Sequence, residues 1–414
     1  MAFHTLRALA DAGHEIVFVS PSEGSPATVE AIREAMREWS EPILTPPRRR
    51  PALDAAARAL FGAAPFTIRR HFRAKVKAAV AGRLAAGRFD VVHCEQVHAL
   101  AQAEPAEALG VPIVLRQHNV ESELWRQLAR ELPWRLRAFR PFLHLEAARM
   151  RRYETQAMRR AGLTVALTAR DAERLAALAG AGTLVRLVRA PFPEHLPAAE
   201  DGLSGEPAAV LFGDQRWLPN RLQCERFIGE TWPRVTRDLP DARLHAFGSV
   251  RGAGRHDGVV RHSAPIDSRD AFVPGGVLVV PLRVASGVRM KILEAWARGV
   301  PVVATSLAAA GLEVEDGREL LIAEDGEGFA RALGRLATEP ELAAGLIARG
   351  RGALAARHDP ATVAAELVEV YREAIARRAA ANPARPAAST QPAASTQPAA
   401  STQPTASIQP AARR

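Results

Sequence analysis

The stretch SGVRMKILEAWARGVPVVAT, residues 286–305, decides the fold of the second half of this 414-residue chain. Gly287 opens an expected helix that carries Lys291 and Glu294, and Gly299 ends it before a buried strand. Unpaired backbone N–H groups at a helix N-terminus carry partial positive charge and suit phosphate oxygens. The arrangement therefore fits a nucleotide diphosphate site, although the same spacing also fits an ordinary helix followed by a strand.

Strand and helix patterns alternate along the rest of the chain. A helix over residues 3–13 comes first, and short apolar runs separated by amphipathic stretches follow it. The expected strands span residues 16–20, 91–95, 113–117, 163–167, 184–189, 209–212, 243–247, 277–281, 300–305 and 320–323. This spacing predicts βαβ units and parallel sheets, which is an α/β fold.

A proline-rich stretch divides the chain, which predicts two Rossmann-like, doubly wound domains that face a ligand cleft. The expected parts are a first domain over 1–189, a linker over 190–207, a second domain over 208–360, a C-terminal helix over 361–378 and a tail over 379–414. In the tail the unit Pro-Ala-Ala-Ser-Thr-Gln occurs three times from Pro386 to Gln403. Such a tract has no large side chains to bury, so we expect it to be disordered and to carry no chemistry.

The composition is that of a globular protein, with 48% apolar and 24% charged residues. No apolar run approaches the roughly 18 residues of a membrane span, and no secretion signal opens the sequence. The two cysteines, Cys94 and Cys224, lie far apart in apolar segments, as in proteins of a reducing compartment. We therefore expect a cytoplasmic location.

The net charge of +10 has a compositional origin. Lysine occurs only at positions 75, 77 and 291, and nearly all other positive charge is arginine. An excess of alanine and arginine is typical of a GC-rich coding sequence, and no zinc, helix-turn-helix or RNA-binding signature accompanies the charge. We therefore expect no nucleic acid partner.

The second half resembles glycosyltransferase family 4, which has the GT-B fold. The segments that carry the resemblance, in order, are LFGDQRWLPN at 211–220, TWP at 231–233, LPDA at 239–242, FG at 247–248, VPL at 280–282 and the stretch quoted above. The likeness is greatest to bacterial exopolysaccharide and cell-envelope sugar transferases with the signature GxxxKxLEAxAxGxPVVAT. The resemblance implies a nucleotide-sugar donor held mainly by the second domain and a glycan or lipid-linked acceptor held mainly by the first.

The resemblance also implies roles for individual residues. Amides from Gly287, Val288 and Met290, with charge from Arg289 and Lys291, would hold the pyrophosphate, while Glu294 would hold the ribose. Gly213 and Arg216 follow the first strand of the second domain, where the family's backbone and a cation approach the phosphates. Ser286 stands where many relatives carry the first glutamate of a Glu-x7-Glu pair, so recognition of the donor sugar is left unexplained. The family needs no bound metal or other cofactor and retains anomeric configuration.

The first half offers weaker candidates. His118, in the segment RQHNVES over 116–122, corresponds to a family histidine that faces the donor sugar. Glu121 either contributes to the acceptor side or caps the next helix, and Glu95 is a candidate acceptor contact at the end of a strand. The cluster at 93–98 contains two histidines, a cysteine and a glutamate, but strand alternation puts Cys94 on the opposite face from the glutamate. We therefore expect no metal site there.

Two basic groups offer candidate contacts with an anionic membrane surface. The first comprises Arg69, Arg70, Arg73 and Lys77 opposite Phe72, Val76 and Val80. The second comprises Arg135, Arg137, Arg140, Arg149, Arg151 and Arg152, with Trp134, Phe139 and Phe142 interleaved. Interfacial helices combine a cationic face with bulky apolar residues, although a helix packed on a sheet gives the same pattern. A peripheral location on the inner face of the plasma membrane would follow from the first interpretation.

Three classes of function remain open at this point. The leading one is a retaining glycosyltransferase that extends a cell-surface glycan. The second is a nucleotide-sugar epimerase of the same two-domain shape. The third is a truncated, non-catalytic nucleotide-binding partner, because family members begin with a strand and a glycine-rich loop, whereas Met1 falls within the expected first helix.

Overall fold

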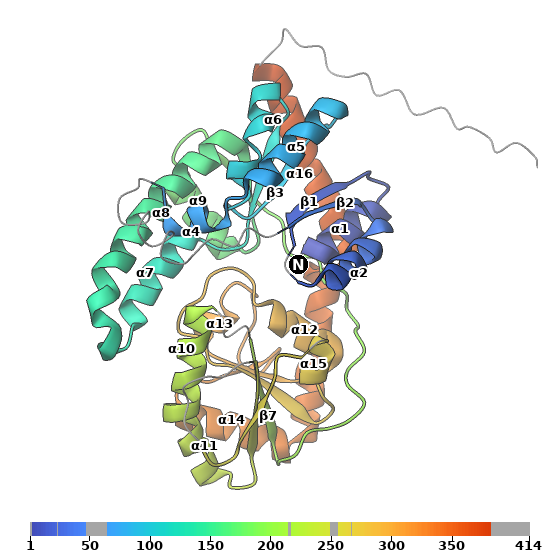
Figure 1. Ribbon diagram of the computed structural model, residues 1–414. Helices are drawn as coiled ribbons and strands as arrows, with labels where there is room; N and C mark the ends of the chain where they lie inside the picture. Colours follow the sequence, from blue (N-terminus) through green and yellow to red (C-terminus); the bar gives the residue numbers. More distant parts are fainter. Residues whose placement is uncertain are drawn as a thin grey trace, which may run out of the picture.

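The computed structural model describes residues 2–22, 24–46, 64–213, 217–248, 256–265 and 267–381. It contains two α/β domains, one above the other in Figure 1, with parallel sheets covered by helices. The residues of the expected tail from 382 onward, and the candidate Arg216, lie outside the described residues.

The first domain contains six described strands in two parallel sheets. Its strands are β1 (Val17–Pro21), β2 (Glu41–Thr45), β3 (Val92–Glu95), β4 (Ile113–Gln117), β5 (Gly162–Ala166) and β6 (Leu184–Leu187). Its helices are α1 (Ala2–Asp11), α2 (Pro26–Arg37), α4 (Phe66–His71), α5 (Ala74–Ala86), α6 (Glu104–Leu109), α7 (Glu121–Glu131), α8 (Arg140–Ala161) and α9 (Ala169–Ala179), with short turns η1 (Leu100–Gln102) and η2 (Trp134–Phe139).

These strands divide into a pair, β1–β2, and a sheet of order β3-β4-β5-β6. No hydrogen-bonded strand of the described chain joins the two sheets, so β1 and β3 each keep one edge unpaired. Unpaired sheet edges are a recognised weakness of a fold.

The second domain has one six-stranded parallel sheet of order β12-β11-β10-β7-β8-β9. Its strands are β7 (Ala208–Phe212), β8 (Arg243–Phe247), β9 (Val259–His262), β10 (Gly276–Val280), β11 (Val302–Ala304) and β12 (Leu321–Ile322). Its helices are α10 (Leu218–Arg226), α11 (Trp232–Asp238), α12 (Met290–Arg298), α13 (Ser306–Ala309), α14 (Gly326–Thr338) and α15 (Pro340–Arg357), with η3 (Phe227–Thr231) and η4 (Ser268–Ala271).

The order in which successive strands are added to this sheet reverses between β7 and β10. Strands β7, β8 and β9 run outward to one edge, and β10, β11 and β12 run to the other. All five residues of β10 are buried, as are all three residues of β11, which is usual for parallel strands covered on both faces. In open α/β sheets a ligand crevice forms where the strand order reverses, at the carboxyl ends of the strands.

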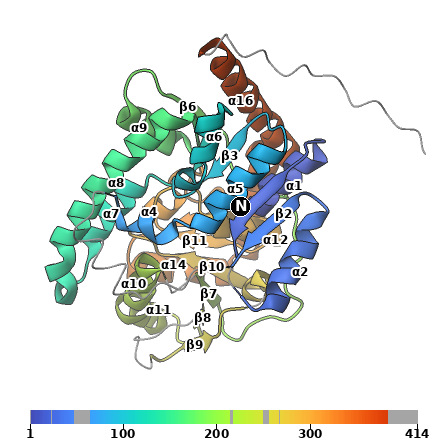
Figure 2. The same ribbon diagram turned by 45° about the horizontal axis from the view of Figure 1, so that its top comes forward.

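The last helix, α16 (Pro360–Ala381), returns from the second domain to the first (Figures 1 and 2). Val363, Leu367 and Val370 on this helix are buried in one cluster with Val114 and Val165 of the first sheet. The predicted C-terminal helix over 361–378 is therefore present and slightly longer, and it completes the core of the first domain.

All ten predicted strands are present, with boundaries shifted by at most two residues at either end. Two strands were missed, β2 and β9, and both lie at the outer edge of a sheet. Neither strand is fully buried, so the apolar pattern that marks a central strand is weak in both. Cys94 and Cys224 are both buried, as their apolar surroundings predict, and neither forms a disulfide within the described residues.

Candidate functional site

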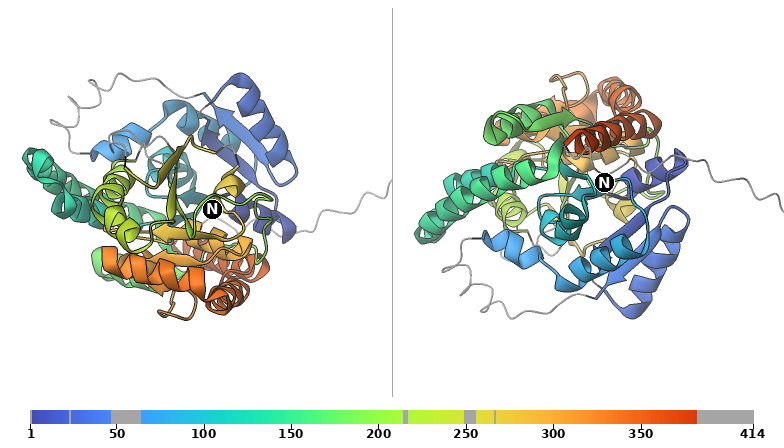
Figure 3. Two further views of the ribbon diagram at one scale, coloured as in Figure 1. Left: turned by 90° about the horizontal axis from the view of Figure 1, so that it is seen from below. Right: turned by 90° about the horizontal axis from the view of Figure 1, so that it is seen from above.

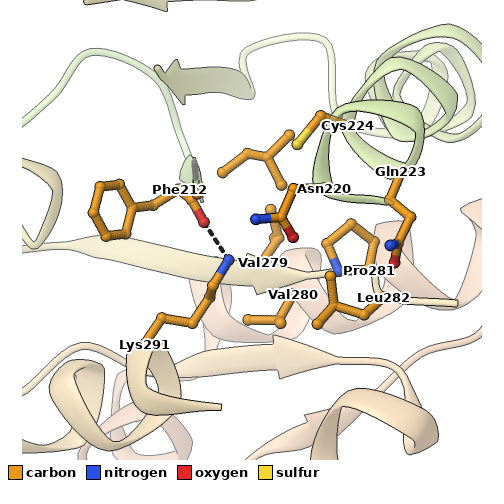
Figure 4. Close-up of a pocket in the computed structure, with 11 residues that line it drawn as sticks. Phe212, Asn220, Gln223, Cys224, Val279, Val280, Pro281, Leu282 and Lys291 are labelled. Carbon is orange, nitrogen blue, oxygen red and sulfur yellow. Dashed lines mark hydrogen bonds between the residues drawn. The ribbon is translucent and has the colours of Figure 1, made fainter. Parts of the chain in front are cut away.

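A pocket lies where the second sheet changes direction, beside the carboxyl ends of β7 and β10 (Figure 4). It is a narrow crevice with a cavity volume of about 10 Å³. Its lining comes from both strands, from α10 and from the first turn of α12: Leu211, Phe212, Gly213, Asn220, Gln223, Cys224, Val279, Val280, Pro281, Leu282 and Lys291. The pocket thus contains two predicted donor-site residues, Gly213 and Lys291.

Lys291 is the cation of this pocket. Its Nζ donates a hydrogen bond to the carbonyl oxygen of Phe212 at the end of β7 (Figure 4). Burial and the nearby Arg289 guanidinium lower the pKa of Lys291 to about 8, although Cys224 opposes the shift. A Cβ atom at Gly213 would lie 3.0 Å from Nζ, so a glycine lets the ammonium group approach the turn. The pocket therefore holds a partly desolvated cation that a bound anion would stabilise.

Arg289 precedes α12 and is a second, half-buried cation. Burial lowers the pKa of Arg289 to about 10, and Asp171 of the first domain opposes that shift. Val288 is buried, and Met290 is the first residue of the helix. The prediction that Gly287 opens the helix is therefore wrong by three residues, because Gly287 has φ +73° and belongs to the loop before it. Gly299 ends the helix in the left-handed conformation, as predicted from the sequence.

Glu294 lies one turn further along α12, where it is part of a small polar group. Its Oε1 accepts hydrogen bonds from Ser268 Oγ at 2.5 Å and from Arg298 Nε at 3.0 Å. The Arg298 guanidinium also lies over the ring of Phe272, with 5.7 Å between Cζ and the ring centroid. The carboxylate is thus fixed in orientation, as a ribose-binding group needs to be.

The loop before α12 contacts the first domain. Ser286 Oγ accepts a hydrogen bond from the Val120 amide (2.9 Å) and donates one to Asp171 Oδ1 (3.0 Å). The Gly287 amide donates to Asp171 Oδ2 at 2.7 Å. Gly287 has φ +73°, and a Cβ atom there would lie 1.8 Å from the His118 carbonyl oxygen. Only glycine permits this approach of the two domains.

Asp171, in the first turn of α9, was not predicted from the sequence. Its carboxylate accepts the Gly287 amide, which is one of the groups expected to bind pyrophosphate. In this structure the Asp171 carboxylate therefore binds an amide of the loop before α12 that is expected to bind the pyrophosphate. The only local signal is the capping pattern at Thr168, which predicts a helix start and no contact with the other domain.

His118 and Glu95 lie together at the ends of β4 and β3. His118 Nε2 is hydrogen bonded to Glu95 Oε2, and its Nδ1 lies 3.0 Å from Gln96 Nε2. An amide nitrogen only donates, so Nδ1 accepts and the ring proton sits on Nε2, facing Glu95. The expected direct contact of His118 with a donor sugar would thus have to replace the Gln96 amide.

Glu95 is the centre of a larger network. Burial alone would raise the pKa of Glu95, but the Arg116 guanidinium at 3.3 Å and the hydrogen bond from His118 hold it well below its usual range. His93 Nε2 lies 3.4 Å from Glu95 Oε1, and its Nδ1 is hydrogen bonded to the Tyr371 hydroxyl of α16 (2.7 Å). Glu95 therefore orients His118, and the last helix supports the network.

Gln96 connects this network to a second histidine. Its backbone has φ +70°, an unusual conformation for a residue other than glycine. Its Oε1 lies 3.1 Å from His98 Nδ1, while its Nε2 faces His118. The turn after β3 is thus held in an energetically costly conformation that places one amide between two imidazole rings.

Glu121 is a half-buried carboxyl group whose pKa is raised to about 7 by burial. The N-terminus of α7 is capped by Glu154, whose Oε1 and Oε2 accept from the amides of Glu121 (2.7 Å) and Ser122 (3.1 Å). Burial raises the pKa of Glu154 to about 8. The capping carboxylate thus comes from α8, and Glu121 itself supplies an amide.

The cluster over 93–98 has the alternation predicted from the sequence, because Glu95 contacts His93 while Cys94 is buried in the core. Within the described ranges, no group of three or more histidine, cysteine, aspartate or glutamate residues is arranged to hold a metal ion. Every helix in those ranges is too short or too polar to span a bilayer.

Two doubly wound parallel domains, with a cationic pocket at the point where the second sheet changes direction, define the GT-B class of glycosyltransferases. Family models agree with this class: one described as Glycosyltransferase Family 4 matches residues 1–189, and one described as Glycosyl transferases group 1 matches residues 210–339. The chain belongs to glycosyltransferase family 4.

Solved structures show the same fold at low sequence identity. Sucrose-phosphate synthase from Thermosynechococcus elongatus aligns with a TM-score of 0.61 and 14% identity over 89% of this chain and 98% of that chain. HepE from Anabaena, solved in complex with UDP and glucose, aligns with a TM-score of 0.59 and 13% identity over 87% and 99%.

A curated relative has no assigned activity. It is described as an uncharacterized 44.6 kDa protein in the cps region of Klebsiella pneumoniae and is 26% identical over 157 residues. The match covers 34% of this chain and 40% of that relative, so it spans less than half the length of the relative.

Proposed function

We propose that this protein transfers a sugar from a nucleotide-sugar donor to a cell-surface glycan or a lipid-linked acceptor, with retention of configuration. The observation that carries the proposal is the position of Lys291, whose ammonium group lies in the pocket between the carboxyl ends of β7 and β10. The GT-B fold and the membership of family 4 support the reaction class.

The chemistry of sugar transfer needs cations more than it needs a nucleophile. As the bond to the sugar breaks, the ring becomes oxocarbenium-like and negative charge develops on the leaving diphosphate. Lys291 and Arg289 would stabilise that charge together with the amides at the start of α12, in a site from which closure of the domains excludes water. These groups carry the proposal without a metal ion or other cofactor.

The donor would lie along the first two turns of α12. Glu294 would accept hydrogen bonds from the ribose hydroxyls, and Gly213 lets the diphosphate reach the end of β7. The Gly287 amide is engaged by Asp171 in this structure, so binding of the pyrophosphate at this amide requires the carboxylate to move. Uridine nucleotides are the first to test, because HepE was solved with UDP-glucose.

The acceptor would bind against the first domain, with His118 and the half-buried Glu121 near the sugar. Glu95 would act as a positioning residue, because it touches His118 and fixes its tautomer. A lipid-linked acceptor would bring the protein to the inner face of the plasma membrane from the cytoplasm.

The direct test is release of nucleoside diphosphate from a panel of nucleotide sugars, with and without candidate acceptors. We expect release to depend on the acceptor and to fall sharply in Lys291→Ala and Glu294→Ala. Turnover that is unchanged in both variants would contradict the proposed site. Conversion of the donor without an acceptor would indicate an epimerase, and donor binding without transfer would indicate a non-catalytic partner.

A further inference from the structure

The helical hairpin formed by α7, η2 and α8 carries bulky apolar side chains that the protein leaves exposed. Trp134 is 79% exposed, Phe139 60% and Leu145 45%, and all three lie in η2 or the first turns of α8. The hairpin projects from the first domain, as the views from below and above show (Figure 3). A tryptophan exposed to this extent is unusual, because its large apolar surface is normally covered.

The exposed residues continue along one face of α8. Pro141, His144, Leu145 and Ala148 follow helical spacing and are all exposed, while Leu143 on the other side is buried against α7. Together with the exposed Trp134 and Phe139, we call these residues the hairpin surface. The helix therefore has one apolar face toward the protein and a second, partly apolar face toward solvent.

Positive charge surrounds the hairpin surface. The exposed arginines on or beside it are Arg130, Arg135, Arg137, Arg151 and Arg152. The two acidic residues between positions 130 and 152 are occupied elsewhere: Glu131 pairs with Arg226 at 3.4 Å, and the buried Glu146 pairs with Arg149 at 2.8 Å. Arg135 forms an ion pair with Glu225 of α10, with 3.3 Å between Nη2 and Oε2.

The exposed aromatic side chains and the arginines around them together indicate the kind of partner. A second copy of the chain would place arginine against arginine around the contact, and that repulsion would oppose association. An anionic bilayer accepts the aromatic rings at the depth of its headgroups and attracts each nearby arginine. We propose that the hairpin surface, centred on Trp134 and Phe139, docks this protein on an anionic lipid membrane.

The other basic group of the first domain does not have this form. Its apolar residues are covered, since Val76 is buried and Phe72 and Val80 are both partly buried. Lys77 is neutralised by Glu104 at 2.5 Å. Arg70 on α4 and Lys75 on α5 are exposed on helices whose apolar sides already pack on the protein, and they serve as a matched control.

The hairpin also reaches the candidate site. Its helix α7 begins next to Val120, whose amide donates a hydrogen bond to Ser286 Oγ in the loop before α12 that is expected to bind the diphosphate. With 11 residues, α7 is about 16 Å long, so its far end lies about that distance from the cleft. The proposal deepens the proposed function by placing a lipid-linked acceptor near the cleft, but vesicle binding itself does not depend on sugar transfer.

The test is co-sedimentation of the full chain with vesicles of phosphatidylcholine alone and of phosphatidylcholine mixed with phosphatidylglycerol. We expect binding only to the anionic vesicles, with an affinity that falls as salt rises. Trp134→Ser combined with Phe139→Ser should weaken binding at least tenfold, and Arg137→Gln combined with Arg151→Gln should weaken it several-fold. Both pairs are exposed, so folding should be unchanged.

The control is Arg70→Gln combined with Lys75→Gln, which removes the same charge from two exposed positions on α4 and α5 and should change binding less than twofold. Equal loss in the control, or full binding by the Trp134 and Phe139 double variant, would overturn the proposal. Nucleotide release with a water-soluble acceptor, measured without vesicles, should be equal in all these variants. A failure of sugar transfer would therefore be seen separately from a failure of membrane docking.

Discussion

In the second domain, one short segment at the start of α12 brings two cations, a carboxylate and several amides to the cleft, whereas the first domain assembles its side from distant residues. Glu95, His118 and Tyr371 come from two strands and the last helix, and the bond between His93 and Tyr371 joins residues 278 positions apart. The groups that would stabilise the charge of the diphosphate thus come from one segment of the sequence. The orientation of His118, by contrast, depends on residues that only the completed fold brings together. Each prediction below tests one side of this difference.

The largest effect on activity should come from the second domain. Replacing Lys291 by alanine removes the pocket's ammonium group, and we expect kcat/KM to fall by about 100- to 1,000-fold, the cost of removing one charge-stabilising donor. Lys291→Arg, which keeps the charge, should retain far more activity. Nucleotide release under donor-limited conditions measures both, and a loss below tenfold in the alanine variant would place the phosphate elsewhere.

Gly287 tests whether the two domains need their close contact. Gly287→Ala puts a methyl group 1.8 Å from the His118 carbonyl oxygen at φ +73°, so the loop must shift or the domains must separate. We expect the free energy of unfolding to fall by about 2–4 kcal/mol. Gly317→Ala is the control, because Gly317 has φ +74° and nothing within 4 Å of the added atom.

Thermal and denaturant unfolding measure both glycine variants. The Gly317 control should lose only about 1 kcal/mol, the strain of the left-handed conformation. Equal losses in the two variants would mean that the interdomain contact contributes nothing.

The first domain should respond more moderately. Glu95→Gln removes the negative charge that pairs with His118 and Arg116, so the tautomer of His118 is no longer fixed. We expect a roughly tenfold fall in kcat with little change in the donor KM. The pKa of Glu95 lies well below its usual value of 4.5, so this carboxylate contributes stability above pH 4.5 that is lost as pH falls toward the folded-state pKa. The variant should therefore show a weaker loss of stability in acid.

Tyr371→Phe is the control for this network, because it leaves the bond between Glu95 and His118 intact. It should cost about 1 kcal/mol of stability and little activity. A larger loss of kcat in Tyr371→Phe than in Glu95→Gln would contradict the role given to Glu95.

Asp171 connects the two sides, and its replacement should have the smallest effect. Asp171→Asn removes a negative charge from the loop that is expected to bind pyrophosphate, so nucleoside diphosphate should bind about three- to tenfold more tightly. Titration calorimetry at two salt concentrations checks this, with a smaller gain at high salt. Weaker binding in the variant would show that Asp171 assists the donor and does not compete with it.

The sequence predicted the second domain better than the first for a physical reason. The segment over 286–305 contains its helix, charges, C-terminal cap and strand in one stretch, so local spacing predicted these elements, although the helix begins at Met290 and not at Gly287. Edge strands β2 and β9 were missed because neither is fully buried. Asp171 and Tyr371 were missed as site residues because their contacts depend on how distant elements pack, and no local pattern contains that information.

The central claim is that Lys291 holds the diphosphate of a nucleotide sugar, and the most direct measurement is the affinity for UDP-glucose between pH 6.5 and 9. The pKa of Lys291 is about 8, so the free protein loses this cation above that pH. Affinity in the native protein should fall toward tenfold per pH unit above 8, whereas Lys291→Arg should remain nearly constant. Parallel pH profiles in the two proteins would contradict the assignment.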